Sequence, residues 1–180
     1  MEKTLQYHRV LQFMDMNKLR GLSGRSLRAE ITRQADEMKN SNRISAPQRA
    51  CIREGSIAAF YEGELGRRML ASGRVEREWP FNVMMRVSEA LSRDEAGIYG
   101  KEEILVQGVI DCCFEEGGQW VLLDYKTSRE LDSAALTERY FSQLRMYALA
   151  LERITGMPVK EISLCLLLSG EHIPVDIGRK

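Results

Sequence analysis

The chain has 180 residues, of which 44% are hydrophobic and 29% are charged, and these proportions fit one globular domain. Lys plus Arg and Asp plus Glu both number 26, so the formal net charge is zero, and any attraction to nucleic acid must come from a local site. No apolar run approaches the roughly 20 residues needed to span a bilayer. The first ten residues carry charges where a secretory signal needs an apolar stretch. These features exclude a transmembrane protein and predict a cytoplasmic one.

Residues 1–72 carry helical patterns. A first helix, which includes His8, is expected to end at a glycine- and serine-rich break at 21–26, and a second helix follows this break. After a polar loop, two short helices are expected over 47–63 and 63–72. The beginning of the chain is therefore predicted to be a helical segment.

From Arg74 onward the pattern is typical of strands. The expected elements are a strand at 77–85, two β-rich runs at 103–116 and 119–128, a long helix at 133–155 and a buried strand at 159–170. Gly117-Gly118 separates the two β-rich runs and predicts a hairpin. This order predicts an α/β fold with a mixed sheet. Residues 1–180 are expected to form a single domain, in which 1–72 is the helical segment and 73–180 is the sheet-containing core.

The hairpin register places two aspartates opposite each other. With Gly117-Gly118 as the loop, residue 116 faces 119 and Asp111 faces Asp124, so both side chains project to one face with Cβ atoms about 5 Å apart. Alternation along the strand puts Lys126 on the same face. Two opposed like charges cost up to about 1 kcal/mol when exposed, and more when desolvated. A hard cation such as Mg²⁺ compensates for this repulsion; the alternative is an ordinary strand whose charges are solvated on an open sheet face.

Three motifs in order resemble those of a known family. GVID (108–111), LLDYKT (122–127) and QLRMY (143–147) are similar to motifs of the PD-(D/E)XK nuclease superfamily, in its AddA/RecB-type helicase–nuclease branch. The resemblance extends over about residues 5–170. It implies a restriction-endonuclease-like core, in which a mixed central sheet is flanked by helices, and it implies a metal-dependent deoxyribonuclease.

The resemblance also implies the roles of five residues. Asp111 and Asp124 are then metal ligands and catalytic residues, and Lys126 is the catalytic lysine. The backbone carbonyl of Tyr125 completes the coordination of the metal. His8 matches the helix histidine that ligates the metal in this branch, although a lone histidine on a helix is otherwise a structural residue.

Two further residues lie on the long helix. Gln143 and Tyr147 are spaced i and i+4 and share one helix face. The resemblance places Gln143 near the lysine and the metal as a catalytic residue, and Tyr147 against the substrate backbone. The alternative is a helix surface on which Tyr147 packs against the sheet. Glu78, on the first strand, is either an outer carboxylate of the site or a structural residue.

Arginines make the helical half locally basic. Among them, Arg67 and Arg68 are the candidates for contacts with DNA phosphates. The others are Arg43, Arg49, Arg53, Arg74 and Arg77. A solvated helical face with scattered glutamates is the alternative.

The function implied by the resemblance is that of a Mg²⁺-dependent DNA exonuclease or endonuclease, in which Mn²⁺ or Ca²⁺ can substitute for binding. It would be the nuclease domain of an ATP-dependent helicase–nuclease in double-strand break repair and recombination. The chain has no G-x-x-x-x-G-K-[ST] loop, so the motor would lie elsewhere. Implied partners are DNA (single strands or unwound duplex ends), a helicase motor domain and a second helicase–nuclease subunit, with no membrane. Alternatives are a stand-alone phage- or CRISPR-associated exonuclease, or a catalytically silent DNA-binding or assembly module.

Overall fold

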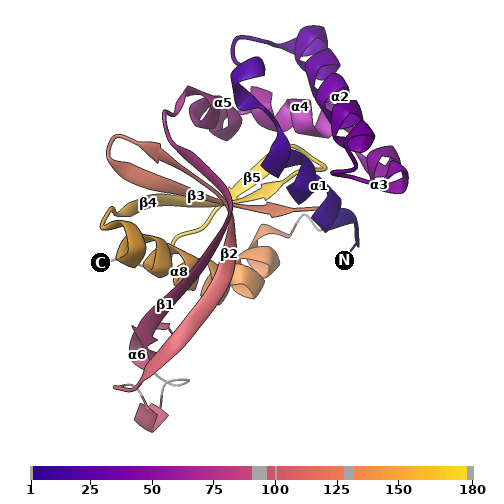
Figure 1. The fold of residues 1–180 in the computed structure, drawn as a ribbon. Helices are drawn as coiled ribbons and strands as arrows, with labels where there is room; N and C mark the ends of the chain where they lie inside the picture. Colours follow the sequence, from indigo (N-terminus) through magenta and orange to yellow (C-terminus); the bar gives the residue numbers. More distant parts are fainter. Residues whose placement is uncertain (1, 91–96, 100, 128–131, 178–180) are drawn as a thin grey trace.

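One five-stranded mixed sheet lies at the centre of the computed structural model (Figure 1). The structure describes residues 2–90, 97–99, 101–127 and 132–177. The strands are adjacent in chain order: β1 (Val75–Arg86), β2 (Glu103–Glu116), β3 (Gln119–Lys126), β4 (Val159–Leu166) and β5 (Glu171–Pro174). Neighbouring strands are antiparallel except β3 and β4, which are parallel and need a crossover. The predicted mixed sheet is confirmed.

The predicted helical segment is also confirmed, with one more α-helix than expected and an additional short 3-10 helix. It contains α1 (Glu2–Phe13), the 3-10 helix η1 (Met16–Lys18), α2 (Gly24–Asn40), α3 (Ala46–Cys51), α4 (Glu54–Glu62) and α5 (Glu64–Ala71). The single helix expected over 47–63 is wrong, because the backbone is extended at Ile52. Ile52 is buried, and the N–H of Arg53 donates to the hydroxyl of Tyr7. Tertiary contacts therefore stabilise the break.

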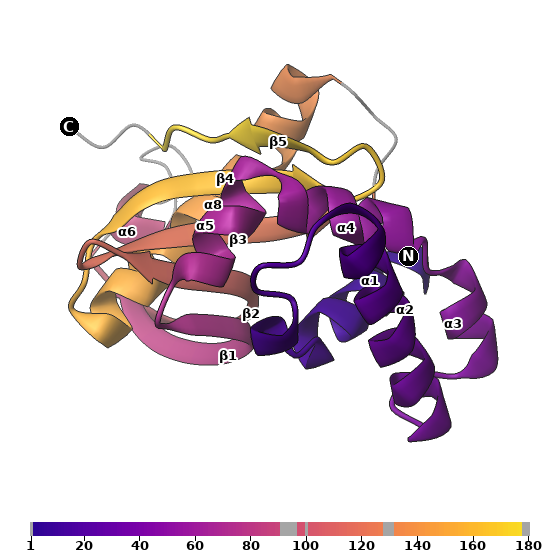
Figure 2. The same ribbon diagram turned by 90° about the horizontal axis from the view of Figure 1, so that it is seen from above.

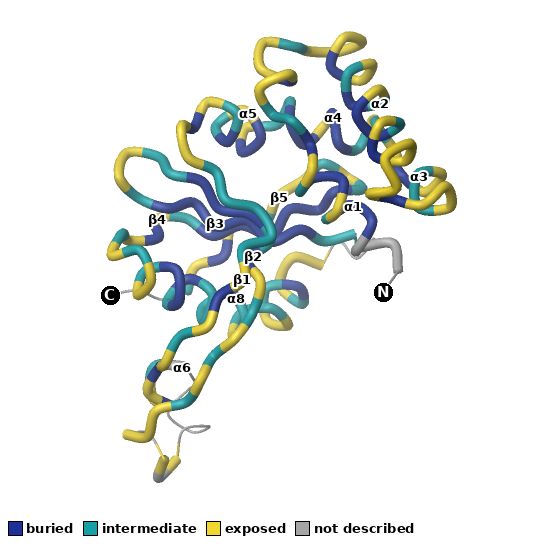
Figure 3. Tube along the Cα trace, in the orientation of Figure 1, coloured by how far each residue is buried: buried dark blue, intermediate teal, exposed yellow. Residues whose placement is uncertain are grey.

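Helices cover both faces of the sheet (Figures 1 and 2). On one face, Leu11 and Phe60 of the helical segment share a buried cluster with Phe114 and Tyr125 of the sheet. On the other face, α8 and the alternate side chains of the strands form a second cluster. β3 lies between these clusters and is almost completely buried (Figure 3), which explains its nearly continuous apolar sequence.

Helix α8 (Ser133–Thr155) supplies the crossover between the parallel strands and agrees with the predicted bounds. It begins where the side chain of Asp132 accepts hydrogen bonds from the N–H groups of Ala134 and Ala135, an N-cap. It ends at Gly156, whose φ of 69° suits a C-cap without a side chain. In the described ranges, no helix is long and apolar enough to cross a membrane.

β1 and β2 form a ribbon that extends beyond the rest of the sheet (Figure 1). They pair from Val75↔Phe114 to Arg86↔Glu103, whereas β3 pairs with β2 only from residue 112 to residue 116. The short helices α6 (Val87–Ala90) and η2 (Gly97–Tyr99) lie at the far end of the ribbon. β2 and β3 therefore diverge at Asp111, and this divergence is called the fork below.

Helices α4 and α5 approach each other closely at Gly66. A Cβ atom at Gly66 would lie 2.6 Å from the Cα of Tyr61 and would also overlap the carbonyl of Phe60. Such contacts with backbone cannot be relieved by a side-chain rotation. We expect Gly66→Ala to lower the melting temperature by about 5 °C or more, because overpacking costs about 1–3 kcal/mol. Thermal unfolding followed by circular dichroism measures the change.

Gly55→Ala is the matched control, because a Cβ at Gly55 of α4 meets nothing within 4 Å. Alanine favours a helix over glycine by about 0.5–1 kcal/mol, so this variant is expected to melt at the same temperature as the parent or slightly higher. Equal melting temperatures for the two variants would contradict the close approach.

Candidate metal centre

The fork is built by Asp111 and the backbone of Tyr125. The predicted hairpin register is confirmed from Glu116↔Gln119 to the pair of residues 112 and 123. The next pair, Asp111 with Asp124, does not form, which corrects the expectation of a regular ladder at this point. Instead, the carboxylate of Asp111 accepts a hydrogen bond of 2.8 Å from the N–H of Tyr125. The side chain of Asp111 thus replaces a strand partner, and the strands separate.

At the fork, the side chains of β1 and β2 change the side of the sheet to which they point. Arg77 points into the helical segment, where it donates to backbone carbonyls of Leu11 and Met14, but Trp79, two residues later, packs on the α8 side. Likewise, residue 110 belongs to the α8 cluster and residue 112 to the opposite cluster. Regular alternation would keep each pair on one face. The switch coincides with Glu78, whose φ of +49° is left-handed and costs about 1–3 kcal/mol.

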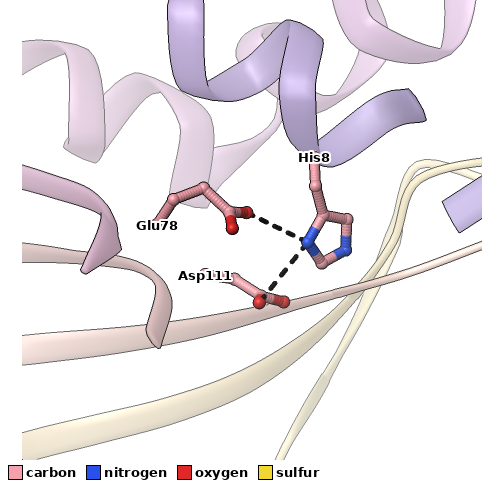
Figure 4. Close-up of side chains that lie close together, drawn as sticks. All are labelled: His8, Glu78 and Asp111. Atoms are coloured by element: carbon pink, nitrogen blue, oxygen red, sulfur yellow. Dashed lines mark hydrogen bonds and ion pairs between the residues drawn. The ribbon is translucent and has the colours of Figure 1, made fainter. Parts of the chain in front are cut away.

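This backbone brings Glu78 and Asp111 to His8 of α1 (Figure 4). The Nδ1 atom of His8 lies 3.1 Å from Oε1 of Glu78 and 3.4 Å from Oδ1 of Asp111. One ligand atom of each residue lies within 4.8 Å of the others. The Nε2–H of His8 donates to the carbonyl of Tyr125 at 3.2 Å. Of the two interpretations of Glu78, the structure supports a carboxylate in the site.

The electrostatics of this cluster favour a cation. Burial, followed by the charge of Asp124, raises the pKa of Asp111 to about 7. Burial also raises the pKa of Asp124, although Lys126 opposes the shift. Burial lowers the pKa of His8, but its hydrogen bond to Glu78 and the charge of Asp111 raise it by more. The site thus holds excess negative charge that protons neutralise in part, and nitrogen and carboxylate ligands are suited to a divalent cation.

A second group of side chains adjoins Asp124, which is only 2% exposed. The Nζ of Lys126 lies 2.6 Å from Oδ2 of Asp124, as alternation along β3 predicts. From α8, the Nε2 of Gln143 lies 3.5 Å from Oδ1. The structure therefore brings together the aspartate, lysine and glutamine that the sequence singled out, while their catalytic roles remain predictions.

Tyr147 lies one helical turn after Gln143 and packs on the ribbon. Its ring meets Phe81 edge-on, with centroids 5.4 Å apart. Gly108 provides the space, because a Cβ there would lie 3.0 Å from the Tyr147 ring and 2.9 Å from Phe81. Tyr147 thus packs against the sheet with one edge of its ring, as the alternative interpretation expected. Its contact with DNA remains a prediction.

The two arginines predicted to contact DNA, Arg67 and Arg68, lie in different surroundings. Arg68 binds the carboxylates of Glu116 and Glu161 at 2.9 and 2.7 Å. These glutamates lie near the hairpin turn and the start of β4, at the opposite end of the strands from the fork. The structure therefore pairs Arg68 with two glutamates far from the fork, and its contact with DNA remains a prediction. Arg67 is exposed and lines a groove of about 620 Å³ that contains no residue of the metal cluster.

A family model and the related proteins found by comparison point to the same family. The model of the PD-(D/E)XK nuclease superfamily matches residues 5–174. The chain is 35% identical over 169 residues to the A subunit of the ATP-dependent helicase/nuclease of Clostridium botulinum (strain Hall). It is 38% identical over 161 residues to the corresponding protein of Alkaliphilus metalliredigens and 37% over 171 residues to that of Thermoanaerobacter sp. (strain X514). These matches cover 94%, 88% and 94% of the chain, which spans about 13% of each relative.

The raised pKa values predict how pH affects the metal-free protein. Because the folded state holds the protons of Asp111 and His8 more tightly than the unfolded chain does, stability increases as the pH falls from 8 to 6. Asp111→Asn keeps an acceptor for the N–H of Tyr125 and removes the charge. We expect this variant to melt several degrees higher than the parent at pH 8 in EDTA and to depend less on pH.

Differential scanning calorimetry between pH 6 and 8 makes this measurement. Asp36→Asn is the control, because Asp36 is half-exposed and pairs with Arg49 at the surface, where ion pairs contribute about 0–1 kcal/mol. A clear loss of stability in Asp111→Asn at pH 8 would show that the charge of Asp111 does not destabilise the metal-free protein.

Glu78 is predicted to contribute to metal affinity. We expect Glu78→Gln to weaken Mg²⁺ or Mn²⁺ binding by about tenfold, because it removes a charge that faces His8 and Asp111. Glu76→Gln changes the same residue type two positions earlier, where the side chain is 39% exposed and pairs with Arg74, and should bind normally. Isothermal titration calorimetry compares the two variants. Normal affinity in Glu78→Gln would restrict Glu78 to a structural role.

Proposed function

Because the chain belongs to the PD-(D/E)XK nuclease superfamily, whose members use divalent metals, we propose that it is a Mg²⁺-dependent deoxyribonuclease that hydrolyses phosphodiester bonds. The restriction-endonuclease-like core agrees with this membership. The observation that carries the proposal is the fork, where His8, Glu78 and Asp111 meet beside Asp124 and Lys126. An architecture that only bound DNA would not need carboxylates buried so closely together.

The ligands of the metal would be His8, Asp111, Asp124 and the carbonyl of Tyr125, and Glu78 is added to the predicted set. When bound, the dication would lower the pKa of a water molecule and offset the negative charge of the scissile phosphate. Asp111 and Asp124 contribute the negative charge that selects a dication. His8 and Asp111 must give up their extra protons to act as ligands, and these protons would be released to solvent when the metal binds.

Lys126 assists the reaction from the Asp124 side of the fork. Its ammonium is held 2.6 Å from a proposed ligand, so it reaches the phosphate that the same centre binds. There it neutralises charge that develops in the transition state, without reorganisation of the side chain. Gln143 contacts the other oxygen of Asp124 and orients the carboxylate.

The proposed role of the whole protein is supported by the relatives, which are named as ATP-dependent helicase/nuclease subunits. We infer that the chain acts as the nuclease domain of such an assembly in double-strand break repair and recombination. Single strands or unwound duplex ends would be delivered by a helicase motor domain, together with a second helicase–nuclease subunit. Tyr147, beside the fork, and the exposed Arg67 are the proposed contacts with the DNA backbone.

Lys126→Ala tests the enzymatic proposal. We expect cleavage of linear single-stranded DNA with Mg²⁺ to fall by about 10²-fold or more, because one electrostatic contact to the transition state is lost. Metal affinity should change little, since no ligand is removed. Cleavage is measured on end-labelled DNA, and metal affinity by calorimetry.

Lys160→Ala is the matched control, because Lys160 pairs with Glu116 at the far end of the hairpin and should leave cleavage unchanged. EDTA should abolish the activity of the parent protein. If the folded parent shows no metal-dependent cleavage, the chain is a binding or assembly module instead.

A further inference from the structure

The ammonium of Lys126 lies between a carboxylate and an aromatic face. Its Nζ is 2.6 Å from Oδ2 of Asp124 and 3.8 Å from the centroid of the Tyr140 ring. The lysine side chain is only 15% exposed. A cation within about 6 Å of a ring centroid is attracted by the electrons of the ring face. The contact with Tyr140 therefore has the geometry of a close cation–π interaction.

The two partners of Lys126 differ in how they respond to a metal. Asp124 is a proposed ligand, so a bound dication would take up much of its charge and would also repel the ammonium. The attraction of the Tyr140 ring does not depend on the charge of Asp124. We propose that Tyr140 is a positioning residue that keeps the ammonium of Lys126 in the fork when Asp124 binds the metal. This inference rests on the proposed nuclease function and adds a residue to its site.

Helix α8 is suited to hold the ring in place. Tyr140 is half-buried and packs against the cluster on the α8 side of the sheet. It lies one turn before Gln143, on the helix face that meets Asp124. The buried Leu144 fixes this part of the helix to the sheet. The position of the ring is thus set by core packing, and the flexible lysine adopts a conformation that meets it.

A graded change of the ring at position 140 separates this role from space filling. Phenylalanine carrying increasing numbers of fluorine atoms keeps nearly the same shape while its face loses negative character. We expect Tyr140→Phe to retain most of the activity, and kcat to fall progressively along the fluorinated series, reaching about a tenfold loss for pentafluorophenylalanine. The KM for DNA should change little. Tyr140→Leu should match the lowest member.

The same fluorinated series at Phe141 is the matched control. Phe141 is the next residue of α8 and is also partly buried in this cluster, so it reports on packing alone. We expect kcat to be constant along the Phe141 series. A constant kcat along the Tyr140 series, in an active parent protein, would overturn the proposal.

A spectroscopic measurement tests the contact without cleavage. Protons beneath an aromatic face are shifted upfield, so the ε-methylene protons of Lys126 should show a ring-current shift in the parent and lose it in Tyr140→Leu. The shift should persist when Mg²⁺ is added. Loss of the shift on Mg²⁺ addition would overturn the proposal even if the protein is a nuclease. A persistent shift in a protein that does not cleave DNA would overturn only the proposed function.

Discussion

Repulsion among buried carboxylates is the constraint on which this structure depends. Glu78, Asp111 and Asp124 approach one another where water is largely excluded, and the pKa of Asp111 rises to about 7 as a result. The left-handed backbone at Glu78 adds a local cost. Both unfavourable features are offset by the packing of helices on the two faces of the sheet, which buries a hydrophobic cluster on each face. The fold thus supplies the stability that keeps these carboxylates close together, as the proposed metal centre requires.

Tyr125 is the residue that connects the helical segment to the site. Its N–H donates to Asp111 and its carbonyl accepts from His8, so both backbone groups are used where β3 leaves β2. Its ring is buried in the helical segment, edge-on to Phe60 of α4 at 5.5 Å. Packing of the helices on the sheet therefore helps to position the backbone of Tyr125 at the fork. The hydrophobic core and the candidate metal centre share this residue, so they cannot be altered independently.

Local features of the sequence were sufficient to predict much of this structure. Gly117-Gly118 and the period of two along the strands predicted the pairing of 112–116 with 119–123 and the approach of Lys126 to Asp124, and both agree with the structure. The ends of α8 followed from its periodicity and from Gly156. These predictions succeeded because hairpin register, strand alternation and helix termination depend on residues within a few positions of each other.

What only the tertiary structure decided involves partners far apart in the chain. His8 and Glu78 are separated by 70 positions, and no periodicity shows that the strand reverses its faces at Glu78. The glutamates that bind Arg68 lie 48 and 93 positions away, so no local pattern in the sequence indicated these ion pairs. The ring of Tyr140 meets Lys126 only because α8 crosses the sheet at that level. The sequence by itself determined the chemical groups and their local spacing, whereas the packing of the helices decided which of them meet, because contact energies between distant segments are not encoded in any short pattern.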